Sequence, residues 1–251
     1  MYSNLILLCD FDGVIITQNA LRYVALKLIK KEFYRWQNIH TLRLIDFARI
    51  FEESDDQNRY KALIKAFRAY KKHIPSIWRR FVFFIIFQRS YKKYEKIYDY
   101  INTDLEDILE KLKERLIPMA IISNTKRKRL DFFSNKYCLS EYFSLIISRN
   151  DTSYKKPHPY PINLALNLIK TEFKFEKINK NGVYFIGDLP TDVECAKKAG
   201  VNSIALLSGH GTTKDLEKSN PTFLIRNFKD LLNLEPFKGF LAHTKNTYCI
   251  N

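Results

Sequence analysis

The amino-acid sequence predicts an α/β protein, with a Rossmann-like, three-layer core around a parallel sheet and an inserted all-helical cap domain. Short apolar stretches alternate with helical patterns after residue 100, which is typical of a parallel sheet covered on both faces. Residues 4–9 are almost uniformly apolar, as expected for a strand buried on both sides. Residues 19–98 lack this alternation, so we expect an insertion after the first strand.

The elements of the predicted core follow one another in a regular order. Thr103 or Asp104 is suited to cap the first helix after residue 100, and Gly200 is suited to close the helix over residues 191–199. The stretch from residue 236 onwards carries no clear pattern. In full, we expect helices over residues 104–115, 126–137, 161–170, 191–199 and 228–232, and strands over residues 118–122, 145–148, 183–186, 203–207 and 222–225.

The insertion has helical apolar spacing and a strong positive charge. Leu21, Val24 and Leu28 lie at positions i, i+3 and i+7, on one face of a helix, and Pro75 is expected to separate two helices. Residues 20–100 contain 19 basic and 8 acidic side chains, so +11 of the chain's net charge of +15 lies there. We assign residues 1–16 and 100–251 to the core and residues 17–99 to the cap.

Composition excludes several classes of protein. A chain of 251 residues, 46% of them hydrophobic, can bury a full core. Its longest apolar run, residues 81–87, is far shorter than the ~20 residues that a membrane-spanning helix needs. The N-terminus lacks a signal-peptide pattern, so we expect a soluble cytoplasmic protein. The four cysteines form no CxxC pair, which predicts buried free thiols rather than zinc or disulfides.

Polar side chains follow the predicted strands where each strand ends. In parallel sheets, these carboxyl ends meet at one edge, where ligands bind. We therefore expect the polar side chains to converge there. They are Asp10 and Asp12 after the first strand, Ser123 and Asn124 after the second, Lys156 in a Lys-Lys-Pro-His-Pro loop, and Asp188 and Asp192 around a later strand end.

This set of side chains suits phosphate chemistry. Carboxylates without nitrogen or sulfur ligands favour Mg²⁺, and a cation with a lysine and a hydroxyl can hold a transferring phosphoryl group. One aspartate could then act as nucleophile. Asp12 lies two residues after Asp10, on the same side of an extended strand, and could serve as general acid and base. Taken singly, each of these motifs is also compatible with a turn, a helix cap or a surface lysine.

The same residues resemble the four motifs of the haloacid dehalogenase-like hydrolase superfamily, in its group with a helical (type C1) cap. The matching segments are residues 10–14 (DFDGV), 121–124 (IISN), 156–157 (KP) and 187–192 (GDLPTD). Their order and spacing agree over roughly residues 5–207. The acid at position 12 argues against the dehalogenase branch. Residues 208–211, which include His210, follow a strand end and could line the cleft, but we interpret them as a flexible turn.

The resemblance implies a role for each site residue. It assigns Asp10 as nucleophile and Asp12 as general acid and base. It implies that Ser123, Asn124 (through its backbone amide) and Lys156 hold the substrate phosphate. It further implies that Mg²⁺ is held by Asp10, the backbone carbonyl of Asp12 and Asp188, with Asp192 supporting the metal shell.

We therefore expect a magnesium-dependent phosphatase that dephosphorylates a small metabolite through an aspartyl-phosphate. Sugar phosphates, phosphoglycolate and nucleotides are all compatible substrates. A sugar-phosphate mutase is an alternative, because it shares the first chemical step. A second alternative is a protein whose basic, aromatic cap binds nucleic acid or another anionic partner. The sequence leaves the oligomeric state and the roles of the cap and C-terminal tail open.

Overall fold

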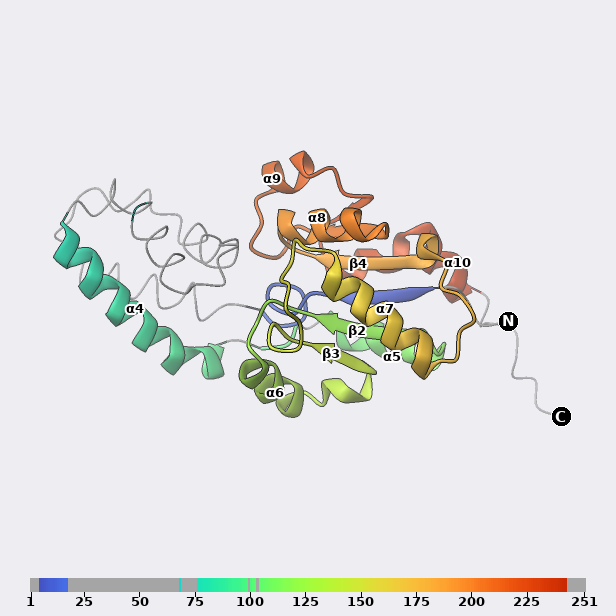
Figure 1. The fold of residues 1–251 in the computed structure, drawn as a ribbon, viewed down its shortest axis with the longest axis horizontal. Coiled ribbons are helices and arrows are strands. Elements are labelled where there is room, and N and C mark those ends of the chain that lie inside the picture. The colour runs from blue at the N-terminus through green and yellow to red at the C-terminus, as the bar shows by residue number, and fades with distance from the viewer. Residues whose placement is uncertain (1–4, 18–67, 69–75, 99, 103, 243–251) are drawn as a thin grey trace. The chain divides into compact units, whose positions relative to one another are not determined.

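The computed structural model describes residues 5–17, 68, 76–98, 100–102 and 104–242. The chain divides into two compact units, one formed by residues 1–15 and 101–251 and the other by residues 16–100. The first unit contains all the strands of the described chain (Figure 1). The assignment of a core and a cap to these parts stays a prediction.

A six-stranded, all-parallel sheet lies at the centre of the first unit. Its strand order is β3-β2-β1-β4-β5-β6, the arrangement of a Rossmann fold, so the predicted α/β class is confirmed. β1, β2 and β4 are buried along their whole length, which explains their uniformly apolar sequences. The bounds are β1 Ile6–Cys9, β2 Met119–Ile122, β3 Leu145–Ile147, β4 Val183–Gly187, β5 Asn202–Leu206 and β6 Phe223–Ile225.

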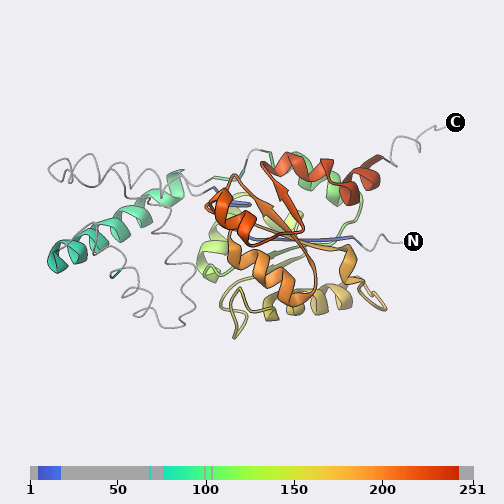
Figure 2. The same ribbon diagram turned by 90° about the horizontal axis from the view of Figure 1, so that it is seen from above.

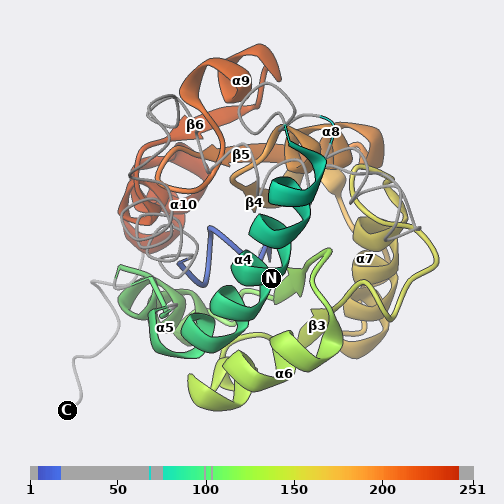
Figure 3. The ribbon, with the colours of Figure 1, turned by 90° about the vertical axis from the view of Figure 1, so that its left-hand side faces the viewer.

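Helices cover both faces of this sheet. Figures 2 and 3 show α7 (Tyr160–Glu172) and α8 (Pro190–Ala199) on one face, and α5 (Glu106–Glu114) and α10 (Glu235–Ala242) on the other. The remaining helices of this unit are α6 (Arg127–Lys136) and the short α9 (Thr213–Lys218). Apolar residues of α7 and α8 pack with β1, β2 and β4 in one buried cluster, so these helices present one apolar face to the sheet.

The structure confirms the predicted C-terminal cap of α8 and contradicts the predicted N-terminal cap of α5. Gly200 follows α8 with φ of +72°, and glycine tolerates this left-handed conformation best. The prediction that Asp104 caps the first core helix is wrong: α5 has Leu105 at its N-cap position. The Asp104 carboxylate instead lies 2.7 Å from Lys229 Nζ. Thr103 lies outside the described residues.

The C-terminal part differs from the prediction in two places. Residues Phe228–Asn233 form a 3-10 helix rather than the expected final α-helix. The last described helix is α10, which the sequence pattern did not reveal. Phe237 of α10 is fully buried, with its ring centroid 5.2 Å from that of Tyr184 on β4. The packing of Phe237 against Tyr184 therefore attaches α10 to the sheet.

The second unit contributes α4 (Ile77–Tyr98), which agrees with the helical pattern expected there. The two ends of this unit are paired, because Thr17 Oγ1 donates to the Tyr100 carbonyl at 3.0 Å and the Thr17 amide donates to the same oxygen at 2.8 Å. The predicted helix face from Leu21 and the break at Pro75 lie outside the described residues. Among the described helices, none combines the length and apolarity needed to cross a bilayer.

The cysteines follow the predicted pattern only in part. Cys9 and Cys195 are buried free thiols, but Cys138 is exposed, which corrects the prediction for that residue. Cys138 adopts the left-handed conformation at the start of a 3-10 turn. Cys249 lies outside the described residues.

Candidate active site

Three neighbouring strands bring their carboxyl ends to one edge of the sheet. Cys9, the last residue of β1, is aligned with Ile121 of β2 and with Ile186 of β4. The residues that follow these strands therefore lie side by side. Because every neighbouring pair is parallel, the polar residues predicted from the sequence converge here.

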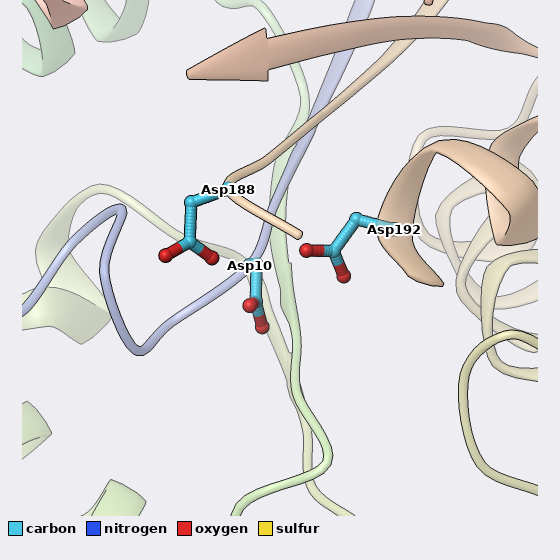
Figure 4. Close-up of side chains that lie close together, drawn as sticks. All are labelled: Asp10, Asp188 and Asp192. Carbon is cyan, nitrogen blue, oxygen red and sulfur yellow. The ribbon is translucent and has the colours of Figure 1, made fainter. Parts of the chain in front are cut away.

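Three aspartates form the centre of this edge. Figure 4 shows Asp10 after β1, with Asp188 and Asp192 from the loop and first turn that connect β4 to α8. Each offers a carboxylate oxygen, and these oxygens lie within 4.8 Å of one another. All three residues are at most 5% exposed. Buried carboxylates this close repel one another unless a cation lies among them.

Lys156 provides a positive charge for two of the three carboxylates. Its Nζ lies 2.5 Å from Asp10 Oδ1 and 2.7 Å from Asp192 Oδ1. The Asn124 side chain fixes the lysine's backbone: its Oδ1 accepts from the Lys156 amide at 3.0 Å and its Nδ2 donates to the Lys156 carbonyl at 3.1 Å. Asn124 thus binds the lysine loop through its side chain, in addition to the backbone role that the resemblance implies.

The Asp12 carboxylate is held by Arg129 of α6 and by Thr125, which precedes that helix. Its Oδ1 lies 2.8 Å from an Arg129 guanidinium nitrogen, and its Oδ2 accepts a hydrogen bond from the Thr125 hydroxyl. Ser123 is buried beside this group, and its Oγ accepts from the Thr125 amide at 3.1 Å. Ser123, Asn124 and Thr125 therefore link the Asp12 region to the Lys156 loop along one segment after β2.

The structure brings the predicted site residues to one edge, and it adds three residues that the sequence did not single out as functional. Thr125 and Arg129 bind Asp12, and His210 binds Asp188, with its Nδ1 2.7 Å from Asp188 Oδ2. Thr125 directly follows the predicted Ser123-Asn124 pair, but Arg129 is one of several basic residues in the first turn of α6, and no sequence spacing distinguishes it. His210 belongs to the stretch that we interpreted as a flexible turn.

For each of these groups, burial shifts the pKa in one direction and the oppositely charged neighbour shifts it in the other. Burial raises the pKa of Asp10 well above its ordinary range; Lys156 works against this shift, and Asp192 and Asp188 add to it. The pKa of Asp192 is raised for the same main reason. For Asp12, burial is outweighed by Arg129 and Thr125, so the pKa is lowered. For Lys156, burial is outweighed by Asp10 and Asp192, so the pKa is raised.

The donor set fits a hard divalent cation. Three carboxylates face one ammonium, which leaves an excess of negative charge. Asp188 Oδ1 is buried, and within the described part of the chain it has no hydrogen-bond partner. Gly187 lies so close to Asp192 that a Cβ added there would be 2.2 Å from the Asp192 Cβ. Oxygen-only sites of this kind suit Mg²⁺ or Ca²⁺ rather than softer metals.

These pKa directions predict how stability responds to pH. An Asp10→Asn variant carries no charge at this position, so at neutral pH in EDTA we expect it to melt at a higher temperature than the native protein. As pH falls through the raised pKa of folded Asp10, the native carboxyl becomes protonated and regains that stability. The difference in Tm should therefore shrink as the pH is lowered from neutral towards the ordinary pKa range of an aspartate. Circular dichroism melting curves measure this, and a constant difference would contradict the raised pKa.

The chain is similar in sequence to curated phosphatases. A phosphoglycolate phosphatase of Photorhabdus laumondii is 29% identical over 148 residues, which cover 59% of this chain and 60% of that protein. A phosphoglycolate phosphatase of Pectobacterium atrosepticum is 28% identical over 130 residues, covering 52% and 53%. The chain thus spans little more than half the length of these curated relatives.

The fold comparison covers more of the chain. The crystal structure of a predicted phosphoglycolate phosphatase from Haemophilus somnus has a TM-score of 0.65, with 17% identity, over 93% of this chain and 99% of that one. A HAD-superfamily hydrolase from Geobacter sulfurreducens has a TM-score of 0.57, with 16% identity, over 92% and 96%. The family model for haloacid dehalogenase-like hydrolases matches residues 7–206. With its Rossmann-type sheet and acidic strand ends, the chain belongs to the haloacid dehalogenase-like hydrolases.

Proposed function

We propose that this protein is a Mg²⁺-dependent phosphatase that hydrolyses phosphomonoesters of small metabolites through a phosphoryl group carried on Asp10. One observation carries the proposal. The Asp10 carboxylate touches the Lys156 ammonium at 2.5 Å on one side, and it lies within 4.8 Å of the Asp188 and Asp192 oxygens. A phosphoryl group there would have a nucleophile, a fixed cation and a cation-binding site within reach. The relatives named phosphoglycolate phosphatase support the same reaction class.

In the first step, an Asp10 oxygen would attack phosphorus and the bond to the leaving oxygen would break. Asp12 would give a proton to that leaving oxygen. In the second step, water would attack the phosphorus of the aspartyl-phosphate, and Asp12 would take up the proton of that water. Phosphate then leaves and the Asp10 carboxylate is restored. Arg129 and Thr125 favour the ionised form of Asp12, which suits it to accept the proton of the water in the second step. Asp12 would have to enter the first step protonated, and the proton taken from the water would be the one given to the next leaving group.

Other residues would hold the substrate phosphate and the cation. Lys156 would neutralise phosphoryl oxygens, and Ser123 would donate its hydroxyl to them. Asp10, the backbone carbonyl of Asp12 and Asp188 would hold Mg²⁺, with Asp192 in support. When bound, the cation would stabilise negative charge on the phosphoryl group. Residues 1–16 and 100–251 would form the catalytic core, and residues 17–99 would act as a helical cap that selects substrates and limits water.

Phosphate release from a panel of phosphomonoesters tests this function. The panel should include phosphoglycolate, sugar phosphates and nucleotides, each measured with Mg²⁺, with Ca²⁺ and with EDTA. We expect hydrolysis that requires Mg²⁺ and that the Asp188→Asn variant loses. Glu194→Gln is the matched control, because Glu194 is an exposed acid on α8 that pairs with Lys198. No release from any substrate, or equal release in EDTA, would contradict the proposal.

A further inference from the structure

Asp188 uses its two carboxylate oxygens in different ways. Oδ2 accepts a hydrogen bond from the His210 backbone amide at 2.7 Å, and it lies 2.7 Å from the His210 ring Nδ1. Oδ1 is buried, and it has no hydrogen-bond partner among the residues that the structure describes. A buried carboxylate oxygen without a partner is costly. In this arrangement, His210 fixes Oδ2 by hydrogen bonding, and Oδ1 is available to bind a ligand.

The loop that carries His210 is attached to Asp188 at a third point. The Gly211 amide donates to the Asp188 backbone carbonyl at 3.0 Å. The loop is also anchored at both ends: the Leu207 amide donates to the Ile225 carbonyl at 2.9 Å, and the Thr212 side chain caps α9 by accepting from the Asp215 amide. His210 is therefore held on a well-anchored segment next to Asp188, rather than on a free turn.

Two glycines let the backbone approach this pair closely. A Cβ at Gly13 would lie 1.9 Å from Asp188 Oδ2 and 2.6 Å from His210 Nδ1. A Cβ at Gly209 would lie 2.2 Å from the Asp188 Cβ. Gly13 also has φ of +84°, a conformation that side chains disfavour. Asp188 and His210 are thus enclosed by backbone on two sides, which restricts the rotation of both side chains.

The geometry distinguishes this role from direct metal binding. The group of oxygens that could hold a cation consists of Asp10, Asp188 and Asp192, without His210. The His210 Nδ1 faces the Asp188 oxygen that is already hydrogen-bonded. Carboxylates that bind metals are commonly oriented in this way by an outer hydrogen-bonding partner.

We propose that His210 is a positioning residue for the divalent cation: it holds Asp188 Oδ2 so that Oδ1 is the oxygen presented to the metal. This inference rests on the proposed function, because it requires a cation at Asp188. It assigns His210 a role that the sequence motifs do not contain. The hydrogen bond, rather than the charge of the imidazole ring, is the operative feature.

The inference is tested by Mg²⁺ affinity. Isothermal titration calorimetry on the EDTA-treated full chain gives the Kd, and the rise in Tm with added Mg²⁺ gives an independent value. For His210→Ala we expect affinity about 10- to 100-fold weaker than native, the usual cost of removing an outer-shell partner. For His210→Asn we expect near-native affinity, because the asparagine amide can donate at about the position of Nδ1. His158→Ala is the matched control, since His158 lies on an exposed loop position.

Two further measurements separate positioning from general damage. The Tm in EDTA shows whether each variant folds. Gly209→Ala, which keeps His210 but crowds Asp188, should also weaken Mg²⁺ binding. In the His210→Ala enzyme, the Mg²⁺ concentration for half-maximal activity should rise while the KM for substrate at saturating Mg²⁺ stays unchanged.

The outcomes are distinct. Unchanged Mg²⁺ affinity in a folded His210→Ala variant would overturn the role of His210 and leave the proposed function standing. Equal weakening in His210→Asn and His210→Ala would overturn the hydrogen-bond explanation. If the native protein binds no Mg²⁺, the proposed function fails, and the inference that rests on it fails too.

Discussion

An Asp10→Asn variant is expected to fold normally and to have lost at least about a thousandfold in kcat. The amide has nearly the same shape as the carboxylate but is a very poor nucleophile, so the phosphoryl group has no acceptor. The fold should survive, because the change removes one of three mutually repelling buried carboxylates. At neutral pH in EDTA, the variant should therefore melt at a higher temperature than the native protein.

The measurement combines phosphate release under single-turnover conditions with melting curves. Asp131→Asn is a suitable control, because Asp131 is an exposed acid on α6, 3.6 Å from Arg127. It should keep native activity. Substantial hydrolysis by a folded Asp10→Asn variant would remove Asp10 from the nucleophile's role. Loss of folding in that variant would contradict the electrostatic account of the three aspartates.

A Lys156→Met variant should lose both activity and stability. The Lys156 side chain is 3% exposed, and its ammonium is the charge closest to Asp10 and Asp192. Methionine fills a similar volume but leaves these buried carboxylates without their counter-charge. Breaking a buried ion pair from one side costs about 3–5 kcal/mol of unfolding free energy. Substrate phosphate would also lose the fixed cation that holds it.

Chemical denaturation with circular dichroism measures this loss, and Lys170→Met, an exposed position on α7, is the matched control. The loss in Lys156→Met should become smaller at acidic pH, because protonation then removes the unpaired charges of Asp10 and Asp192. Mg²⁺ should restore part of the stability, since a bound cation can replace the missing charge. A Lys156→Met variant as stable as native at neutral pH would contradict this view of the ion pairs.

The sheet and the edge that carries the site could be predicted because they depend on local patterns. Uniformly apolar segments such as β1 and β4 predict strands that are buried on both faces. In a parallel sheet, the polar residues after such strands must meet at one edge. Asp10 and Asp188 were therefore expected to be neighbours, and the structure has their oxygens within 4.8 Å. Their chemical roles stay predictions.

The remaining features depend on tertiary contacts that no sequence spacing encodes. Arg129 is one of several basic residues at the start of α6, and only the fold shows that its guanidinium meets Asp12. His210 lies in a glycine-containing stretch typical of a turn, yet its backbone amide and its ring Nδ1 both contact the Asp188 carboxylate. Asp104 has a good capping side chain but pairs with Lys229 instead. In each case, the contact of the side chain is determined by a partner that lies far away in the sequence.

The stereochemical course at phosphorus tests the central claim most directly. A phosphomonoester made chiral with three oxygen isotopes can be turned over with transfer to an alcohol acceptor, and the configuration of the product can then be determined. Transfer through Asp10 requires two in-line displacements at phosphorus, so the account predicts retention of configuration. Inversion would show a single direct displacement by the acceptor and would contradict a phosphoryl group carried on Asp10.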